Sequence, residues 1–229
     1  RPDTDALLER IDSLQNFESS DFSSQITIVS DDPEEGTERS VIRQFRRDDE
    51  DKFLLLIEEP AVQRGQGYLR LDNNLWIYDP ESRQFTLSSA RESFQGTDAR
   101  NSDFEASSFS EDYEVVDYEG GTLGRYDVWI LELEATNNEV TYPQMTIWVT
   151  QGDNALVLKT EDYSSTSRLV RTSYFPQYRS IEDNFIVQRA IYVDELVEGR
   201  RTTIELTDIS LERLPDSVFT KAYVERVNR

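Results

Sequence analysis

The chain has 229 residues, of which 46 are Asp or Glu and 24 are Lys or Arg, so its formal charge is −22. Such an acidic surface repels nucleic acid phosphates and anionic lipid headgroups, and we therefore expect no nucleic acid partner. The sequence contains no cysteine and no histidine, which excludes disulfides, thiolate and imidazole metal sites and Ser-His-Asp catalysis.

The aromatic content indicates a folded chain rather than a disordered one. The sequence has 11 Tyr, 11 Phe and 3 Trp, whereas disordered chains are depleted in aromatic residues. No apolar run approaches the roughly 18 residues of a membrane-spanning helix. The sequence opens on Arg1 and Pro2, and we expect that an export signal, with or without a membrane anchor, preceded them.

The first segment, residues 1–18, is predicted to contain a helix. Apolar residues recur at helical spacing at Leu7, Ile11 and Leu14. Asp3 or Thr4 can provide the N-cap of this helix, because their side-chain oxygens can accept hydrogen bonds from the first free backbone amides.

After Ser19 the hydrophobic period changes to two, which is typical of strands. Short turn signals separate the strand-like segments, so neighbouring strands are expected to form antiparallel hairpins. Thirteen segments are predicted to be strands, of which 53–58 opens with a short apolar run: 22–29, 38–46, 53–58, 67–71, 75–78, 84–87, 113–118, 125–134, 145–150, 155–163, 168–175, 185–193 and 202–210.

Residues 88–109 interrupt the strand pattern. They are rich in Ser, Asp, Asn and Arg, with isolated Phe94, Phe104 and Phe109. Long irregular segments are uncommon in compact domains and are often functional. A second helical pattern occurs only near the C-terminus. No shift in composition divides the chain, so residues 1–229 are predicted to form a single domain.

The predicted strands are apolar mainly on one face, and that face must be covered. A curled sheet partly filled by one or two short helices leaves room for a ligand, whereas full coverage by the same helices leaves no cavity. Trp76, Trp129 and Trp148, with Tyr78 nearby, all lie in strand patterns. They either fill core volume or line an apolar pocket, and the sequence leaves both alternatives open.

Enzymatic chemistry is not predicted. The sequence lacks a G-x-S-x-G elbow, a phosphate-binding P-loop and a dinucleotide fingerprint. Adjacent carboxylates are expected by chance among 46 acidic residues, and none has the spacing of a calcium loop. We therefore predict no catalytic residue, no cofactor and no metal site.

Several motifs resemble the LolA-like family of outer-membrane lipoprotein-sorting proteins. Residues 72–83, DNNLWIYDPESR, resemble the family's W-x-Y-x-P-x-x-R segment, and residues 89–98, SARESFQGTD, resemble the stretch that follows it. The resemblance extends over residues 39–224 and departs from the family at Gln95, Ala99 and Arg100. Further segments match in the family's order: Tyr142-Pro143, Trp148-Val149, 156–163, 168–172, 202–209 and 215–219.

The resemblance implies a mainly β (α+β) fold, a single curled antiparallel sheet that forms an open half-barrel of about eleven strands capped by short helices. It also implies a periplasmic carrier that binds acylated lipoprotein or lipid and receives it from an inner-membrane ABC transporter. Residues 88–109 would form a movable lid, with Arg91, Gly96 and Asp98 in the loop. The candidate acyl-binding residues are Trp76, Tyr78, Phe94, Phe104, Trp129 and Trp148.

Two alternatives to a carrier remain open at this stage. The same scaffold can serve as a sensor or interaction module that binds a protein partner and keeps a dry interior. A lipid hydrolase is disfavoured by the lack of histidine. A cavity large enough for alkyl chains distinguishes a carrier from an interaction module.

Overall fold

A computed structural model describes residues 1–228 and contains one antiparallel sheet of thirteen strands in this part of the chain. Three α-helices accompany the sheet: α1 (Thr4–Gln15), α2 (Phe109–Asp112) and α3 (Lys221–Arg226). The strands are β1 (Phe22–Asp32), β2 (Gly36–Arg47), β3 (Lys52–Glu59), β4 (Gly67–Leu71), β5 (Asn74–Asp79), β6 (Gln84–Ser88), β7 (Tyr113–Leu123), β8 (Tyr126–Ala135), β9 (Gln144–Thr150), β10 (Val157–Tyr163), β11 (Leu169–Ile181), β12 (Asn184–Asp194) and β13 (Arg201–Ser210).

The predicted fold class is confirmed, and each of the thirteen strand patterns corresponds to one strand. The count of about eleven strands implied by the family resemblance is too low by two. The strand order is β6-β5-β4-β3-β2-β1-β13-β12-β11-β10-β9-β8-β7, so every neighbour is a hairpin partner except the pair β1 and β13. That pair joins the N-terminal and C-terminal strands in the middle of the sheet.

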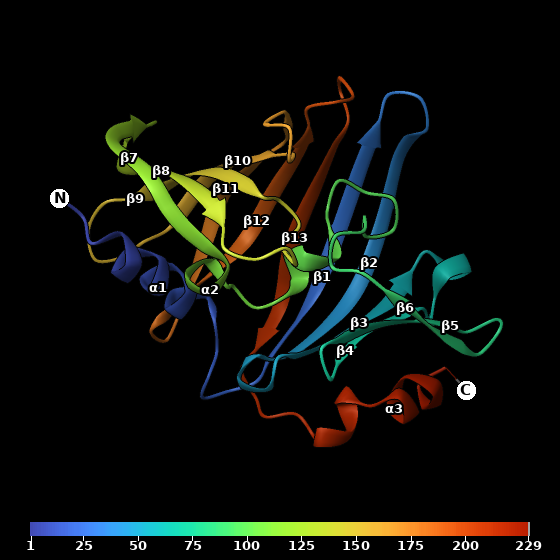
Figure 1. Ribbon diagram of the computed structural model, residues 1–229. Coiled ribbons are helices and arrows are strands. Elements are labelled where there is room, and N and C mark those ends of the chain that lie inside the picture. Colours follow the sequence, from blue (N-terminus) through green and yellow to red (C-terminus); the bar gives the residue numbers. More distant parts are fainter. Residues whose placement is uncertain (229) are drawn as a thin grey trace.

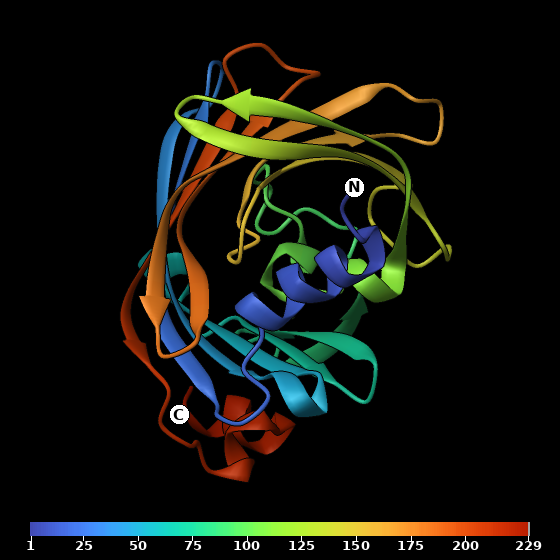
Figure 2. The ribbon, with the colours of Figure 1, turned by 90° about the vertical axis from the view of Figure 1, so that its left-hand side faces the viewer.

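The two edges of the sheet are β6 and β7, which follow each other along the chain. The sheet is curled, but these two edge strands do not pair with each other. The sheet therefore forms an open half-barrel (Figure 1). Residues 89–112, called here the crossing segment, connect the two edges. The crossing segment bridges the gap between the two edges and lies on the concave side of the sheet (Figure 2).

Helix α1 lies inside the curve of the sheet (Figure 2). Asp3 caps it by accepting a hydrogen bond from the Ala6 amide at 3.1 Å. Its buried face carries Leu8, Ile11 and Leu14, which pack on the inward residues of β8 and β9, and Leu7 of the predicted stripe packs partly buried against them. The apolar residues at helical spacing therefore lie on the face of α1 that packs against the sheet.

Strand β3 is buried on both faces. Phe53, Leu55 and Ile57 face the concave core, whereas Leu54 packs outward against the C-terminal segment that includes Phe219 and Val224. A strand covered on both sides requires a continuous apolar run, which explains why residues 53–57 do not alternate. Among the described residues no helix is long and apolar enough to cross a membrane.

Candidate functional site

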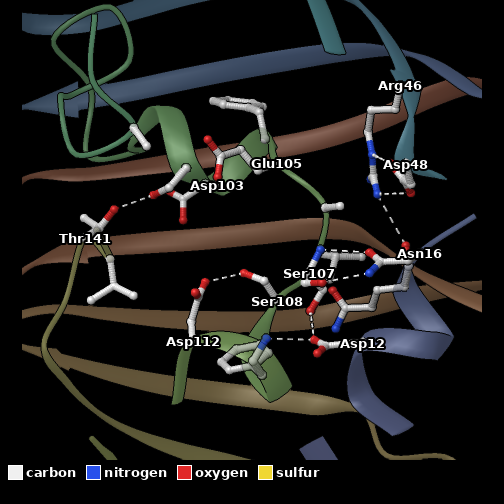
Figure 3. A pocket seen from close by; sticks show the side chains of 18 of the residues that line it. Asp12, Asn16, Arg46, Asp48, Asp103, Glu105, Ser107, Ser108, Asp112 and Thr141 are labelled. Carbon is white, nitrogen blue, oxygen red and sulfur yellow. Dashed lines mark hydrogen bonds and ion pairs between the residues drawn. The ribbon is translucent and has the colours of Figure 1, made fainter. Parts of the chain in front are cut away.

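The concave side of the sheet lines a cavity of about 1300 Å³ that is open to solvent. This volume exceeds the roughly 300–1,000 Å³ that is typical of small-molecule pockets. Strands β1, β12 and β13 provide its apolar floor, and α1 and residues 102–112 of the crossing segment form the opposite wall (Figure 3). The floor includes Phe22, Ile26, Ile186, Ala190, Ile204 and Leu206.

Asp12 joins α1 to the start of α2. Its carboxylate accepts hydrogen bonds from the Ser107 hydroxyl at 2.6 Å, the Phe109 amide at 2.9 Å, and the Ser110 amide and hydroxyl at 2.8 and 2.7 Å. One helix turn later, the Asn16 amide group exchanges two hydrogen bonds with the Ser107 backbone, at 2.7 and 2.8 Å (Figure 3). Polar contacts therefore hold this side of the crossing segment on α1.

Arg171 of β11 holds the middle of the crossing segment from the sheet side. Its guanidinium donates to Asp162 at 2.7 Å, to both oxygens of Asp103 at 2.7 and 3.1 Å, and to the carbonyl of Asp98 at 3.2 Å. The ring of Tyr192 lies 4.4 Å from the guanidinium carbon. Burial opposes the charge, but the two carboxylates raise the pKa of Arg171 well above its usual value, so it stays a cation.

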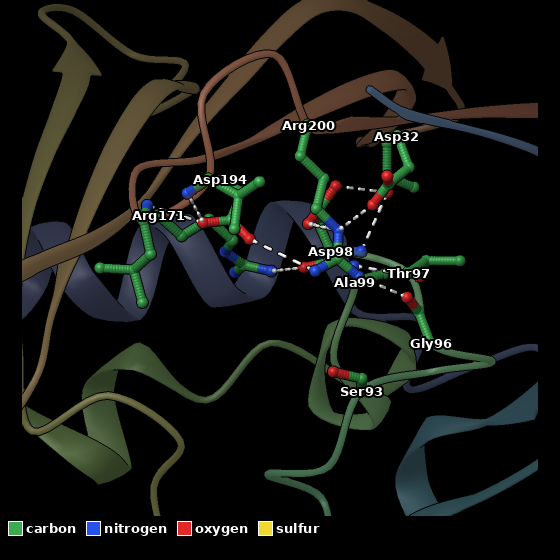
Figure 4. Close-up of polar contacts among 12 residues, drawn as sticks. Asp32, Ser93, Gly96, Thr97, Asp98, Ala99, Arg171, Asp194 and Arg200 are labelled. Carbon is green, nitrogen blue, oxygen red and sulfur yellow. Dashed lines mark hydrogen bonds and ion pairs between the residues drawn. The ribbon is translucent and has the colours of Figure 1, made fainter. Parts of the chain in front are cut away.

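Asp98 anchors the crossing segment to β13 (Figure 4). Its carboxylate accepts from the Thr202 hydroxyl at 2.9 Å, and the same hydroxyl accepts from the Asp98 amide at 2.9 Å. Arg200 lies 3.5 Å from the carboxylate and donates to the Gly96 carbonyl at 2.9 Å. Gly96 has a φ of 69°, a conformation that glycine adopts without steric cost.

A third arginine contacts the crossing segment two residues beyond Asp103. Arg70 of β4 donates to Glu105 at 2.9 Å, so the segment is held by arginines from both walls of the half-barrel. Burial raises the pKa of Glu105, and the positive charge of Arg70 reverses only part of that shift. Burial likewise raises the pKa of Asp98.

These raised pKa values determine whether the folded protein becomes more or less stable as the pH falls. A carboxyl whose pKa is higher in the folded protein than in the unfolded chain opposes folding when both forms are ionised. That opposition is removed as the pH falls through the raised pKa toward the ordinary value. Asp98 and Glu105 therefore favour a more stable fold at mildly acidic pH than at neutral pH.

The two phenylalanines predicted for the lid lie in the concave core. Phe94 is fully buried, with ring centroids of Tyr68 and Phe104 at 4.6 and 4.7 Å. Phe104 also lines the cavity, whereas Phe94 is not among the lining residues. Of the six predicted acyl-binding residues, Phe104 alone lies on the cavity wall formed by the described residues.

Trp76 and Tyr78 lie on the opposite side of the sheet from the cavity. Their neighbours Leu75 and Ile77 belong to the concave core, and side chains alternate along a strand. Trp76 and Tyr78 instead pack under the C-terminal segment, where the Lys221 ammonium lies 3.3 Å from the Trp76 ring centroid. Neither residue lines the concave cavity, so their positions do not support the predicted ligand-binding role.

The other two tryptophans also lie away from the cavity. Trp148 faces outward between the buried Ile147 and Val149, with the Lys159 ammonium 4.2 Å from its ring centroid. Trp129 packs in the core beneath α1, against Tyr118 at 6.2 Å. Neither residue lines the cavity, so the prediction that they bind acyl chains is not supported by their positions.

Of the three predicted loop residues, Gly96 and Asp98 make the anchoring contacts described above. Arg91 is exposed and lines the cavity, and its side chain forms no hydrogen bond or ion pair within residues 1–228. Asp12 and Arg171 were not among the residues predicted for the site. Asp12 could have been identified from its position on the buried face of the predicted helix, because a buried carboxylate needs hydrogen-bond or ionic partners.

Within residues 1–228 no acidic residues are grouped to hold a metal ion. A family model described as "-like: Uncharacterized protein" matches residues 49–226, and a search of curated proteins finds no match.

Solved structures share the fold, among them the following three. A LolA superfamily protein from Nitrosomonas europaea is 27% identical, with a TM-score of 0.83, and the match covers 97% of this chain and 100% of that one. A domain described as an outer membrane lipoprotein-sorting protein from Vibrio parahaemolyticus is 18% identical, with a TM-score of 0.84 over 97% and 98% of the chains. A DUF1329 family protein from Desulfovibrio piger is 22% identical, with a TM-score of 0.83 over 96% and 97%.

Proposed function

Because the chain belongs to the LolA-like family of outer-membrane lipoprotein-sorting proteins, we propose that it is a carrier of acyl chains. It would hold the chains of lipoproteins or lipids in the concave cavity and carry them toward the outer membrane. The observation that supports this most directly is the cavity of about 1300 Å³ with an apolar floor. Burial of each CH₂ contributes about 0.8 kcal/mol, so a few acyl chains suffice for binding without any catalytic group.

The crossing segment is our candidate for a movable lid. Residues 88–109, predicted from the sequence for this role, make up most of it. The segment pairs with no strand of the sheet: its one isolated bridge, Ser93 to Arg100, is internal. It is attached by polar side-chain contacts with Asp12, Arg70 and Arg171 and by the buried rings of Phe94 and Phe104. Side-chain contacts can break without unfolding the sheet, and carriers need such a movement for release.

The same proposal includes the cellular setting. A carrier of this kind would work in the periplasm, receive its cargo from an inner-membrane ABC transporter and perform no chemistry on it. The lack of histidine and of thiols in the sequence is consistent with a role that needs no nucleophile.

Native mass spectrometry of the protein purified from a bacterial host, followed by lipid extraction, tests the carrier function. We expect co-purified acyl compounds. Ala190→Phe should reduce their amount, because Ala190 lines the cavity floor. Arg189→Phe adds the same ring at an exposed position of the same strand and is the matched control.

A measured mass equal to that of the protein without any bound lipid would contradict the proposal if the protein also failed to take up an uncharged naphthylamine dye. That result would favour an interaction module with a closed interior. Equal amounts of lipid in the wild type and the Ala190→Phe variant would place the lipid outside the cavity.

A further inference from the structure

One edge of the sheet lacks the features that usually keep a strand of another molecule away. An edge strand presents unpaired backbone N–H and C=O groups, and charged side chains, prolines and bulges normally protect it. Strand β6 has the sequence QFTLS, with no charged residue and no proline, and its pairing with β5 shows no register shift. Its only protection is its length of five residues.

The opposite edge is protected in two ways. Strand β7 carries Glu114, Asp117 and Glu119, and its pairing with β8 shifts register between Val115 and Asp117. Two such strands brought together would place carboxylates beside carboxylates, which is destabilising. Of the two edges, β6 is therefore the one that can accept a partner strand.

The free side of β6 is open to solvent. Hydrogen bonds to β5 use the backbone groups of alternate residues, so the groups of the other residues point away from the sheet. Within residues 1–228, the backbone of residues 84–88 forms no backbone hydrogen bond outside its pairing with β5. Leu87, opposite Trp76 on the convex face, is 61% exposed, and Thr86 on the concave face is exposed as well. A strand from another molecule therefore meets no side chain that must first be displaced.

The charge around β6 is balanced, unlike that of the whole chain. Glu81 and Arg83 precede the strand, and Arg91 and Glu92 follow it, so each end carries one positive and one negative side chain. Two copies with a formal charge of −22 each repel one another. An uncharged strand with neutral ends is a place where that repulsion is locally small.

From these observations we propose that two copies of the chain pair through β6, antiparallel, about a two-fold axis at Thr86. This register places Thr86 opposite Thr86 of the second copy, and Leu87 opposite Phe85 of the second copy. Apolar side chains then meet on the convex face and hydroxyls on the concave face, and Thr–Thr pairs stabilise antiparallel strands. The same patch serves both copies, as a two-fold interface requires. The inference does not depend on the carrier function.

The short strand limits the strength of this dimer. Five residues on each side give an interface at the small end of the range, where complexes are weak and reversible. We expect dimers to form at chain concentrations of about 0.1 mM. Salt should strengthen the association, because it screens the repulsion between the two acidic copies while the pairing itself is uncharged.

Sedimentation equilibrium of the full chain over a range of concentrations, at low salt and at about 0.3 M salt, measures the association. Leu87→Lys puts a lysine on the edge, the residue that most often protects such strands, and should weaken the dimer at least about tenfold. Leu196→Lys makes the same charge change at an exposed leucine in the β12–β13 turn and should leave the dimer unchanged.

A single engineered cysteine tests the register, because the chain has no cysteine of its own. Thr86→Cys places two thiols opposite each other across the two-fold axis, within the separation that a disulfide spans. We expect a disulfide-linked dimer after mild oxidation. Gln84→Cys is the matched control on the same exposed strand: its thiol lies four residues from that of the second copy, about 13 Å along the strand, and should not be linked.

Three results would overturn the proposal. The first is a monomer mass at both salt concentrations up to about 1 mM chain, ten times the expected range. The second is a dimer that Leu87→Lys leaves intact and that a lysine at the exposed Val116 of β7 disrupts, which would assign the contact to the other edge. The third is a link through Gln84→Cys rather than Thr86→Cys, which would exclude the two-fold register. None of these results bears on the lipid content that tests the carrier function.

Discussion

Replacing Arg171 tests whether the interior depends on a paired buried cation. In Arg171→Leu, the carboxylates of Asp162 and Asp103 lose the guanidinium that lies 2.7 Å from each. Asp162 is fully buried, so it cannot recover its partner from water. Removing one member of a buried ion pair typically costs about 3–5 kcal/mol. We expect a loss of this size, a large part of the roughly 5–15 kcal/mol that holds a domain folded.

Urea denaturation followed by circular dichroism gives the free energy of unfolding. The double variant Arg171→Leu, Asp162→Asn removes the uncompensated buried charge as well, and it should be more stable than Arg171→Leu alone. Arg171→Lys keeps the charge but offers a point donor in place of the fork that reaches both carboxylates, so it should lie between the wild type and Arg171→Leu. A loss below about 1 kcal/mol in Arg171→Leu would refute the reasoning, because it would be in the range of an exposed pair.

Four further predictions follow from the same geometry. Asp12→Ala should destabilise the fold by about 2–4 kcal/mol, because two backbone amides and two hydroxyls lose a charged acceptor, and hydrogen exchange of residues 107–110 should quicken. Phe94→Ala should destabilise it by about 3–5 kcal/mol and quicken exchange across residues 88–109, with β8 and β9 unaffected. Trp76→Ala should lower the stability but leave dye binding unchanged, and weaker dye binding would show that this residue communicates with the cavity. The melting temperature should rise between neutral pH and about pH 5, the acidic end of the usual stability maximum, and the double variant Asp98→Asn, Glu105→Gln should flatten that rise.

The strand segments could be predicted from the sequence because their cause is local. A period of two is imposed by strand geometry, and the thirteen segments predicted to be strands corresponded to thirteen strands. The opening helix was equally local, and its stripe of Leu7, Ile11 and Leu14 faces the core. The pairing of β1 with β13 was not predictable in this way, since it joins residues nearly the whole chain apart.

The candidate site depends on contacts between residues that are distant in the sequence. Residue type alone therefore gave the wrong positions for the tryptophans that were predicted to line the cavity. A tryptophan in an amphipathic strand is equally compatible with either face. Trp76 and Trp148 face outward because the C-terminal segment and a lysine, respectively, cover them there.

The sequence by itself determined the elements, the acidic charge, the lack of histidine and thiol chemistry and the family. Only the tertiary structure decided which face of each strand is concave and that the two edge strands stay unpaired. It also decided that Asp12 and Arg171 hold the segment that connects those edges. The physical reason is that secondary structure follows from neighbours in sequence, whereas a cavity is defined by residues that folding brings together from distant parts of the chain.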